Sequence, residues 1–342
     1  MSRKTFNRIL IAVFIVIIIL SFYKLPYYVY RPGSATELEP LVKVEGNAEK
    51  AEGSFMLTTV SRLEPNIFIY LWARIRPFYE IQRQDDVREE GETQEEFDVQ
   101  QLYLMDHSKY NAIHTAYEYA GIPVKNEYHG VYVVDIIGGM PAETILKPGD
   151  QIIKVDDLEF KSSDEFGSYV KDATDPITIT FLRDGETRTA KIETAPFPEN
   201  PEEHGFGIRL VDDYEVITDP PVEVNSGSIG GPSAGLMFSL EIYNQLTEED
   251  WTKGYEIAGT GEITEDGRVL PIGGIEHKIV AADNKGVDIF FAPSMKVRGT
   301  SNYEEALKVK EQINTDLDIV PVETFEDAIR YLEKLEPEEK GE

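Results

Sequence analysis

An uninterrupted apolar run near the N-terminus places the strongest constraint on the fold, because water-exposed surfaces do not carry such runs. It covers residues 9–20 and follows three basic residues, Arg3, Lys4 and Arg8. Residues 21–23 extend the run as far as Lys24. A membrane-spanning helix needs about 20 apolar residues, whereas the core of a secretory signal has about 7–15. The length alone therefore allows a membrane anchor or a cleaved signal.

The residues that flank this run favour the anchor. No small-x-small cleavage motif follows it, and Pro26 with the tyrosines at 27, 28 and 30 makes a poor cleavage site. We expect these tyrosines at the far headgroup layer, where they would lengthen the span to residues 9–29. Basic sequence before the run and acidic sequence after it predict a cytoplasmic N-terminus, residues 1–8. The predicted protein is single-pass, in the cell membrane, with its bulk extracytoplasmic.

Charge and cysteine content exclude several functions. The 342 residues give room for two or three domains. A net charge of -30 argues against nucleic-acid binding, which depends on Lys and Arg. Without cysteine the chain has no thiol nucleophile, disulfide or zinc–thiolate site. We interpret the acidity as a solvating surface and expect no metal and no cofactor.

The middle of the chain predicts a small β-rich module at residues 123–196. Strand-forming runs at 131–136, 147–155, 177–183 and 187–192 alternate with short helical runs at 142–146 and 163–171. Asp184-Gly185 predicts a hairpin turn, since such turns need positive φ. Before the module, residues 53–60 predict a buried strand, 85–98 form an acidic solvated segment, and 100–121 predict an amphipathic helix.

This module resembles a PDZ domain, most specifically in Pro148-Gly149-Asp150 followed by an alternating Ile/Val strand. In that family a peptide adds a strand to an exposed sheet edge. The resemblance implies that the matching edge is formed by His129, Gly130, Val131 and Tyr132. It implies edge-strand binding, and the alternative is that the module is a rigid spacer.

A glycine-rich segment at 225–231 leads into Pro232 and Ser233. Proline favours the first turn of a helix, and apolar residues from Leu236 onward supply a helical face. Ser233 is therefore expected where unpaired backbone N–H groups and the positive end of the helix dipole gather, which suits a nucleophile and an oxyanion. A plain helix cap is the alternative.

Lys278 is expected on the apolar face of a second helix. Ile275, Lys278, Ile279 and Ala282 follow the spacing i, i+3, i+4, i+7. A desolvated lysine has a lowered pKa and acts as a neutral base. A snorkelling structural lysine is the alternative, whereas His277, about 100° away around the helix, is expected at the surface.

Three segments followed by Lys278 together resemble the proteolytic domain of Lon-type (S16) serine proteases: residues 231–235, 258–264 and 267–274. The family uses a Ser-Lys dyad, which the resemblance places at Ser233 and Lys278. Thr260 is implied to orient the lysine amine, and the supporting positions are Gly231, Pro232 and Ala234. An α+β fold follows, with the proteolytic α/β domain at 197–335, an N-terminal part of it at 30–122 and an acidic tail at 336–342. The PDZ-like module is then inserted in this domain or precedes it.

The chain has no Gly-x-x-x-x-Gly-Lys-[Ser/Thr] phosphate loop, which the ATPase of Lon proteases proper requires. The resemblance therefore implies a bacterial, membrane-anchored PDZ–Lon type that works without ATP on peptides or unfolded proteins, with the PDZ-like module presenting or gating the substrate. Lon-type domains commonly form six-membered rings. Here the ATPase that helps to hold such rings is missing, so a homo-oligomer is possible and the oligomeric state stays open.

Competing functions have less support in the sequence. The histidines at 107, 114, 129 and 204 lie in unrelated segments, which disfavours a Ser-His-Asp triad. The metalloprotease motif His-Glu-x-x-His does not occur. The alternative from another class is a catalytically silent, membrane-tethered adaptor that binds peptides through its PDZ-like groove alone.

Overall fold

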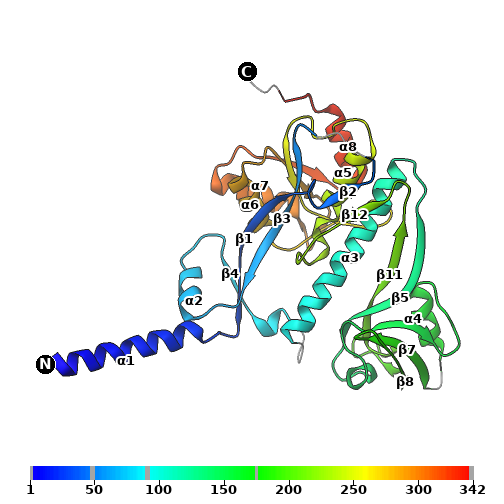
Figure 1. Cartoon of the computed structure of the whole chain (residues 1–342), viewed down its shortest axis with the longest axis horizontal. Coiled ribbons are helices and arrows are strands. Elements are labelled where there is room, and N and C mark those ends of the chain that lie inside the picture. The colour runs from blue at the N-terminus through cyan, green and yellow to red at the C-terminus, as the bar shows by residue number, and fades with distance from the viewer. Residues whose placement is uncertain (1–2, 47–50, 89–92, 174–175, 339–342) are drawn as a thin grey trace.

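The computed structural model describes residues 3–46, 51–88, 93–173 and 176–338. Residues 89–92 of the predicted acidic segment and 339–342 of the predicted acidic tail lie outside the described residues. The architecture is mixed α+β, with an apolar N-terminal helix, an α/β domain and a β-rich module (Figure 1). The helices are α1 (Arg3–Phe22), α2 (Ile67–Ala73), α3 (Gln94–Tyr119), α4 (Ser163–Asp172), α5 (Gly235–Leu246), α6 (Ile275–Lys285), α7 (Asn302–Ile313) and α8 (Phe325–Lys334).

Helix α1 projects away from the rest of the chain (Figure 1), and none of its residues is buried. By length and composition it could cross a membrane. The prediction that the tyrosines after it extend the span is wrong. The helix ends at Phe22, and strand β1 (Tyr27–Glu37) begins with these tyrosines. The Tyr28 side chain is fully buried against the folded domain, so it cannot lie among lipid headgroups.

A six-stranded sheet forms the centre of the α/β domain. Its order is β19 (Asp318–Val322), β16 (Ile289–Pro293), β13 (Glu256–Gly259), β3 (Ser54–Leu63), β1 and β4 (Glu80–Arg83). The first four strands are parallel, and β1 is antiparallel to both β3 and β4. The predicted buried strand at 53–60 is thus β3, with Phe55, Met56 and Leu57 buried in it.

Residues on both sides of the β-rich module share one hydrophobic core. Phe55 from β3 and Ala116 from α3 are buried in the same cluster as Leu236 and Phe238 from α5. Helix α3 packs against α5, although the whole module separates them in the chain. The module is therefore inserted in the α/β domain, the first of the two arrangements that the sequence allowed.

The inserted module is a five-stranded antiparallel sheet with one helix, α4. The strand order is β11 (Ile208–Ile217), β5 (Lys125–Ile136), β6 (Gln151–Val155), β7 (Ile177–Arg183) and β8 (Glu186–Ile192). The hairpin between β7 and β8 turns at Asp184 and Gly185, with φ of 55° and 77° as predicted. Residues 142–146 do not form the expected α-helix, and only a 3-10 turn at Pro141–Thr144 occurs there.

Within the part of the chain that the structure describes, four two-stranded sheets accompany these two larger ones. They pair β2 (Val42–Val44) with β12 (Val222–Val224), β9 (Ala195–Pro196) with β10 (His204–Gly205), β14 (Glu262–Ile263) with β15 (Val269–Leu270), and β17 (Lys296–Val297) with β18 (Thr300–Ser301). Two further 3-10 turns lie at Gln84–Asp86 and Pro232–Ala234.

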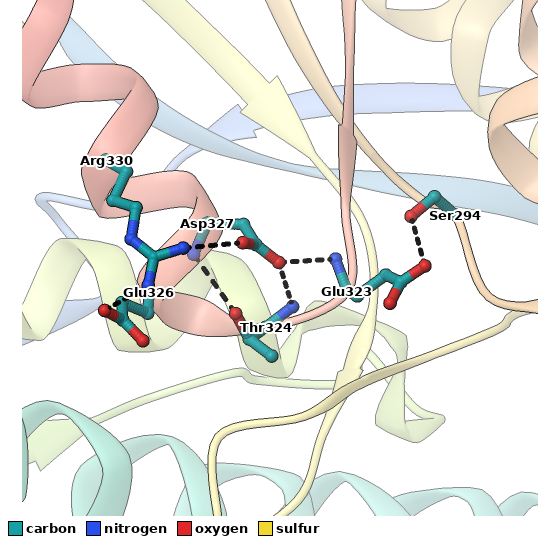
Figure 2. Close-up of polar contacts among 6 residues, drawn as sticks. All are labelled: Ser294, Glu323, Thr324, Glu326, Asp327 and Arg330. Atoms are coloured by element: carbon teal, nitrogen blue, oxygen red, sulfur yellow. Dashed lines mark hydrogen bonds and ion pairs between the residues drawn. The ribbon is translucent and has the colours of Figure 1, made fainter.

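The turn into α8 fixes the β14–β15 hairpin beneath the site. Asp327 accepts hydrogen bonds from the backbone N–H groups of Glu323 and Thr324 at 3.1 and 2.9 Å, and its own N–H donates to Thr324 Oγ1 at 3.2 Å (Figure 2). This capping box satisfies N–H groups that a helix start leaves unpaired. The N–H of Val269 then donates to the Glu323 carbonyl at 2.7 Å, which ties β15 to the capped turn.

Candidate active site

Ser233 lies in the 3-10 turn Pro232–Ala234 that opens α5, so it occupies the predicted helix start, although the first turn is 3-10 rather than α. Gly231 precedes the turn with φ of 85°, a conformation that L side chains rarely adopt. Its N–H donates to the Gln101 carbonyl at 2.8 Å, and Ser108 Oγ donates to the Pro232 carbonyl at 2.8 Å. Helix α3 therefore holds the loop that carries Ser233.

Lys278 lies on the buried face of α6, as its spacing predicted. Its neighbours on that face, Ile275, Ile279 and Ala282, are buried in one cluster against the sheet. Lys278 itself is only 3% exposed. This burial lowers the pKa of its amine to about 7, because the charged form loses its hydration.

The Lys278 amine meets three oxygen atoms from three separate segments of the chain. Its Nζ lies 2.7 Å from Ser233 Oγ, 2.9 Å from Thr260 Oγ1 and 3.1 Å from the Thr58 carbonyl oxygen. A neutral amine has two N–H donors and one lone pair. The Thr58 carbonyl and the Thr260 hydroxyl accept the two N–H groups, which leaves the lone pair for the Ser233 hydroxyl. The environment therefore fits the neutral, basic form of the lysine.

Thr260 links the amine to the serine turn. Its hydroxyl accepts from Lys278 Nζ and donates to the Ser233 carbonyl at 2.9 Å. The N–H of Gly261 donates to the same carbonyl, also at 2.9 Å. The contact predicted for Thr260 is thus present, and Thr260 also fixes the backbone of the serine turn.

The supporting positions next to Ser233 lie in the same turn. Pro232 has no N–H to leave unpaired, and the buried Ala234 anchors the turn in the core. The N–H groups of Ser233 and Ala234 belong to the first turn of a helix, where no intrahelical acceptor exists. They lie at the end of a helix that favours negative charge.

An open cleft of about 800 Å³ leads to the serine and lysine. Its walls are residues 31–34 of β1, 57–61 of β3, the serine loop at 228–234, and Pro271, Ile272 and Gly273. Strand β13 pairs with β3 only as far as Leu57. Beyond Leu57, one edge of β3 still pairs with β1. The opposite edge of β3, which pairs with β13 up to Leu57, has no further partner in β13.

Sequence reasoning missed three residues that build this site. Thr58 supplies a carbonyl to the lysine, while Gln101 and Ser108 hold the serine loop. The run at 53–60 predicted a strand, but no local signal shows that it lies beside residues 256–259. Likewise, the pattern of the helix at 100–121 marks its apolar face and does not show which loop it supports.

The prediction of a surface position for His277 is wrong. His277 is only 4% exposed, although consecutive positions on a helix do lie about 100° apart. Glu80 of β4 lies 3.8 Å from it, and the two residues line a common pocket with Phe78. Helix α6 is thus covered on two faces, by the sheet and by the segment with Phe78 and Glu80. The apolar stripe in its sequence marks only the first of these faces.

The prediction of an open edge at His129, Gly130, Val131 and Tyr132 is also wrong. These residues belong to β5, which lies inside the sheet. On one side Val131 and Tyr132 pair with Ile152 and Gln151 of β6. On the other side they pair with residues 211–212 of β11. A later segment of the same chain therefore occupies the edge where an added peptide was expected.

Strand β11 lies between β5 and the helix of the module. Asp212 accepts hydrogen bonds from the N–H and the hydroxyl of Ser163, at 2.6 and 2.8 Å, at the start of α4. Just before β11, Phe206 is buried in the module core and its ring contacts that of Phe166 on α4. The chain thus supplies an antiparallel strand in the position that PDZ domains offer to peptides.

His129 lies on the exposed rim of this sheet. Its Nε2 is 3.9 Å from Glu127 and 3.8 Å from Glu215 of β11. The ligand atoms of these three exposed residues lie within 4.8 Å of one another. Exposed acidic groups of this kind are common without a metal ion.

Comparison with known families identifies both domains. Residues 213–334 match the Lon protease (S16) C-terminal proteolytic domain, and this range contains Ser233, Thr260 and Lys278. Residues 119–194 match the PDZ domain. The two resemblances predicted from the sequence are therefore confirmed at the level of the domains.

Several Lon proteases are similar to part of the chain. The protein of Metamycoplasma arthritidis is 35% identical over 153 residues, which are 44% of this chain and 17% of that protein. The protein of Campylobacter concisus is 37% identical over 101 residues, 29% of this chain and 12% of that one. Lon protease homolog 2, peroxisomal, of Caenorhabditis elegans is 34% identical over 126 residues, 36% of this chain and 15% of that one. The matches span at most 17% of these relatives.

Among solved structures, the PDZ domain of an SdrC-like protein from Listeria monocytogenes is 33% identical to this chain. The alignment covers 25% of this chain and 90% of that domain, with a TM-score of 0.23. A solution structure from Geobacillus thermodenitrificans is 37% identical and covers 25% of this chain and 100% of that one, with a TM-score of 0.22.

Proposed function

Because the chain carries a Lon-type (S16) proteolytic domain with an inserted PDZ domain, we propose that it is a membrane-anchored serine endopeptidase with a Ser233–Lys278 dyad. The observation that carries the proposal is the buried Lys278 amine, 2.7 Å from Ser233 Oγ. The anchor is α1, and the substrates are peptides or unfolded chains on the extracytoplasmic side of the membrane.

In the proposed reaction, neutral Lys278 takes the proton of the Ser233 hydroxyl as Oγ attacks the peptide carbonyl carbon. The N–H groups of Ser233 and Ala234 stabilise the oxyanion that forms. The protonated amine then gives its proton to the leaving amine, and an acyl-enzyme remains on Ser233. Water hydrolyses this ester, with Lys278 again acting as the base, and frees the second product.

The shape of the cleft supports an extended substrate. A peptide that lies beside residues 58–61 of β3 can hydrogen-bond to the strand edge that β13 leaves unpaired. An extended backbone is available in peptides and unfolded chains, whereas a folded protein keeps its strands paired. Without a phosphate loop, the chain has no nucleotide motor with which to unfold substrates.

The full-length protein in detergent should cleave a mixture of unstructured peptides at the same rate with and without Mg-ATP. We expect this result because proton transfer from Ser233 to Lys278 needs no nucleotide. The measurement is the initial rate of new amino-terminus formation, with Ser233→Ala as the control for contaminating proteases. Cleavage that requires ATP would contradict the motorless mechanism, and equal cleavage by Ser233→Ala would favour the silent adaptor.

We propose that the PDZ domain gates the substrate and does not recruit it through a permanently open sheet edge. Strand β11 occupies the edge of β5, and the chain continues from Ile217 through β12 to the loop that carries Ser233. A peptide can take that edge only when β11 leaves it. Strand β12 pairs with β2 between β11 and the serine loop, so a displacement of β11 reaches that loop only through this pairing.

Replacing Asp212 by alanine should loosen β11 and raise the rate of peptide cleavage several-fold. The change removes the two hydrogen bonds from Ser163 at the start of α4 and a third from the Tyr128 hydroxyl of β5, each worth about 0.5–1.5 kcal/mol. Hydrogen exchange at residues 208–217 reports the release, with Asp157→Ala as a matched control because that side chain is fully exposed. Faster exchange with an unchanged cleavage rate would show that the module is a spacer.

A further inference from the structure

A short helix beside the anchor presents an apolar stripe to solvent. Phe68, Leu71 and Trp72 of α2 are 45%, 54% and 48% exposed, and Ile75, two residues past the end of the helix, is 75% exposed. Their spacing of i, i+3, i+4 and i+7 places them on one face across the end of the helix. The opposite face packs inward, since Ala73 is buried and the Tyr70 ring contacts Tyr27 of β1 at 5.1 Å.

The stripe lies at the end of α1 because specific bonds hold it there. The Asn66 side-chain amide donates to the Ser21 carbonyl at 2.8 Å, and its oxygen caps α2 by accepting from the N–H groups of Phe68 and Ile69. Next to it, Lys24 Nζ donates to the Glu64 carbonyl at 3.0 Å. Figure 1 shows α2 close to the junction between α1 and the folded domain.

We propose that this stripe, Phe68, Leu71, Trp72 and Ile75, is a second membrane contact that inserts into the headgroup layer of the bilayer that α1 spans. The inference rests on the proposed anchor, because only the proximity of α1 brings α2 to a lipid surface. An aromatic ring with an N–H, such as that of Trp72, favours the interface between hydrocarbon and water.

Charge beside the stripe also fits a lipid surface. Arg74 and Arg76 are exposed at the end of α2, and the Arg76 guanidinium lies 4.1 Å from the centre of the Trp72 ring. Arginine side chains reach lipid phosphates while their stems stay in apolar surroundings. The tyrosines at 27, 28 and 30 were predicted for this interfacial role, but they belong to β1, and α2 takes their place.

This contact sets the orientation of the folded domain relative to the membrane. One helix alone leaves the folded domain free to swivel about its connection. Two contacts, α1 and α2, fix its tilt. The protease cleft then keeps a constant orientation above the lipid, suited to substrates that arrive along or close to the membrane surface.

The test uses Trp72 as its own reporter in the full-length chain. The sequence has two tryptophans, and Trp251→Phe leaves Trp72 alone. The protein is reconstituted into vesicles of phosphatidylcholine and phosphatidylglycerol. We expect Trp72 emission at short wavelength, protection from aqueous acrylamide, and stronger quenching by lipids brominated near the headgroup end of the acyl chain than near its methyl end. In the same background, Leu71→Glu should reverse all three effects.

Two controls keep the outcomes distinct. Trp72→Phe retains Trp251, which is 6% exposed in the core of the α/β domain and should not respond to brominated lipids. The difference between wild type and Trp72→Phe also isolates Trp72 if Trp251→Phe fails to fold. Flotation with the vesicles reports the anchor separately. A chain that floats but keeps Trp72 accessible to acrylamide, without quenching by brominated lipid, overturns the second contact and leaves the anchor standing. A chain that does not float overturns both.

Discussion

Ser233→Ala and Lys278→Met should each reduce the rate of peptide cleavage by roughly three orders of magnitude or more. The first change removes the nucleophilic oxygen, and the second removes the base that lies 2.7 Å from it. Because neither group works without the other, the double variant should be no slower than the slower single variant. The measurement is kcat/KM on one defined peptide that the wild-type protein cleaves.

Folding must be unchanged for these losses to be interpreted. Methionine is similar in volume to the lysine stem, and it removes an amine whose charged form is costly to bury. It also leaves the Thr58 carbonyl without one of its donors, so the net change in the free energy of unfolding should be small. Thermal unfolding of each variant checks this expectation. A folded Lys278→Met that keeps more than a tenth of the activity would exclude Lys278 as the base.

The chemistry of the site was predictable from the sequence where local rules determine it. Glycines and Pro232, followed by apolar residues at helical spacing, predict a helix start at Ser233. The spacing of Ile275, Lys278 and Ile279 predicts a buried lysine. These rules act over one or two turns of chain. The structure then brings the serine and the lysine to 2.7 Å, which neither pattern could determine alone.

The incorrect predictions concern contacts between distant segments. His277 is covered by the segment that contains Glu80. The Tyr28 ring lies against the Arg62 guanidinium, and its hydroxyl donates to Gln94 of α3. The edge of β5 is filled by β11, which follows it in the chain only after the rest of the module. Local periodicity shows which face of an element is apolar, but it does not identify the segment that covers the other face.

Peptide cleavage should fall as the pH drops below about 7, by about tenfold for each further pH unit, so that at pH 5 about 1% of the maximal rate remains. Burial lowers the pKa of Lys278 to about 7, and only the neutral amine can accept the serine proton. Above this pH the base is already neutral, and the rate should level off. The measurement is kcat/KM between pH 5 and pH 9 on a peptide without titratable side chains.

The same pKa makes a second, separable prediction about stability. The folded pKa of Lys278 is lower than that of the unfolded chain, so between about pH 7 and pH 10.5 the unfolded state holds a proton that the folded state lacks. The Lys278 contribution to the free energy of unfolding therefore rises with pH across this window, and it is least favourable below pH 7, where the cation is buried. Denaturant unfolding of wild type and Lys278→Met should differ in this slope, because methionine does not titrate. If instead the cleavage rate stays constant down to pH 5 while the protein remains folded, cleavage does not require a neutral Lys278.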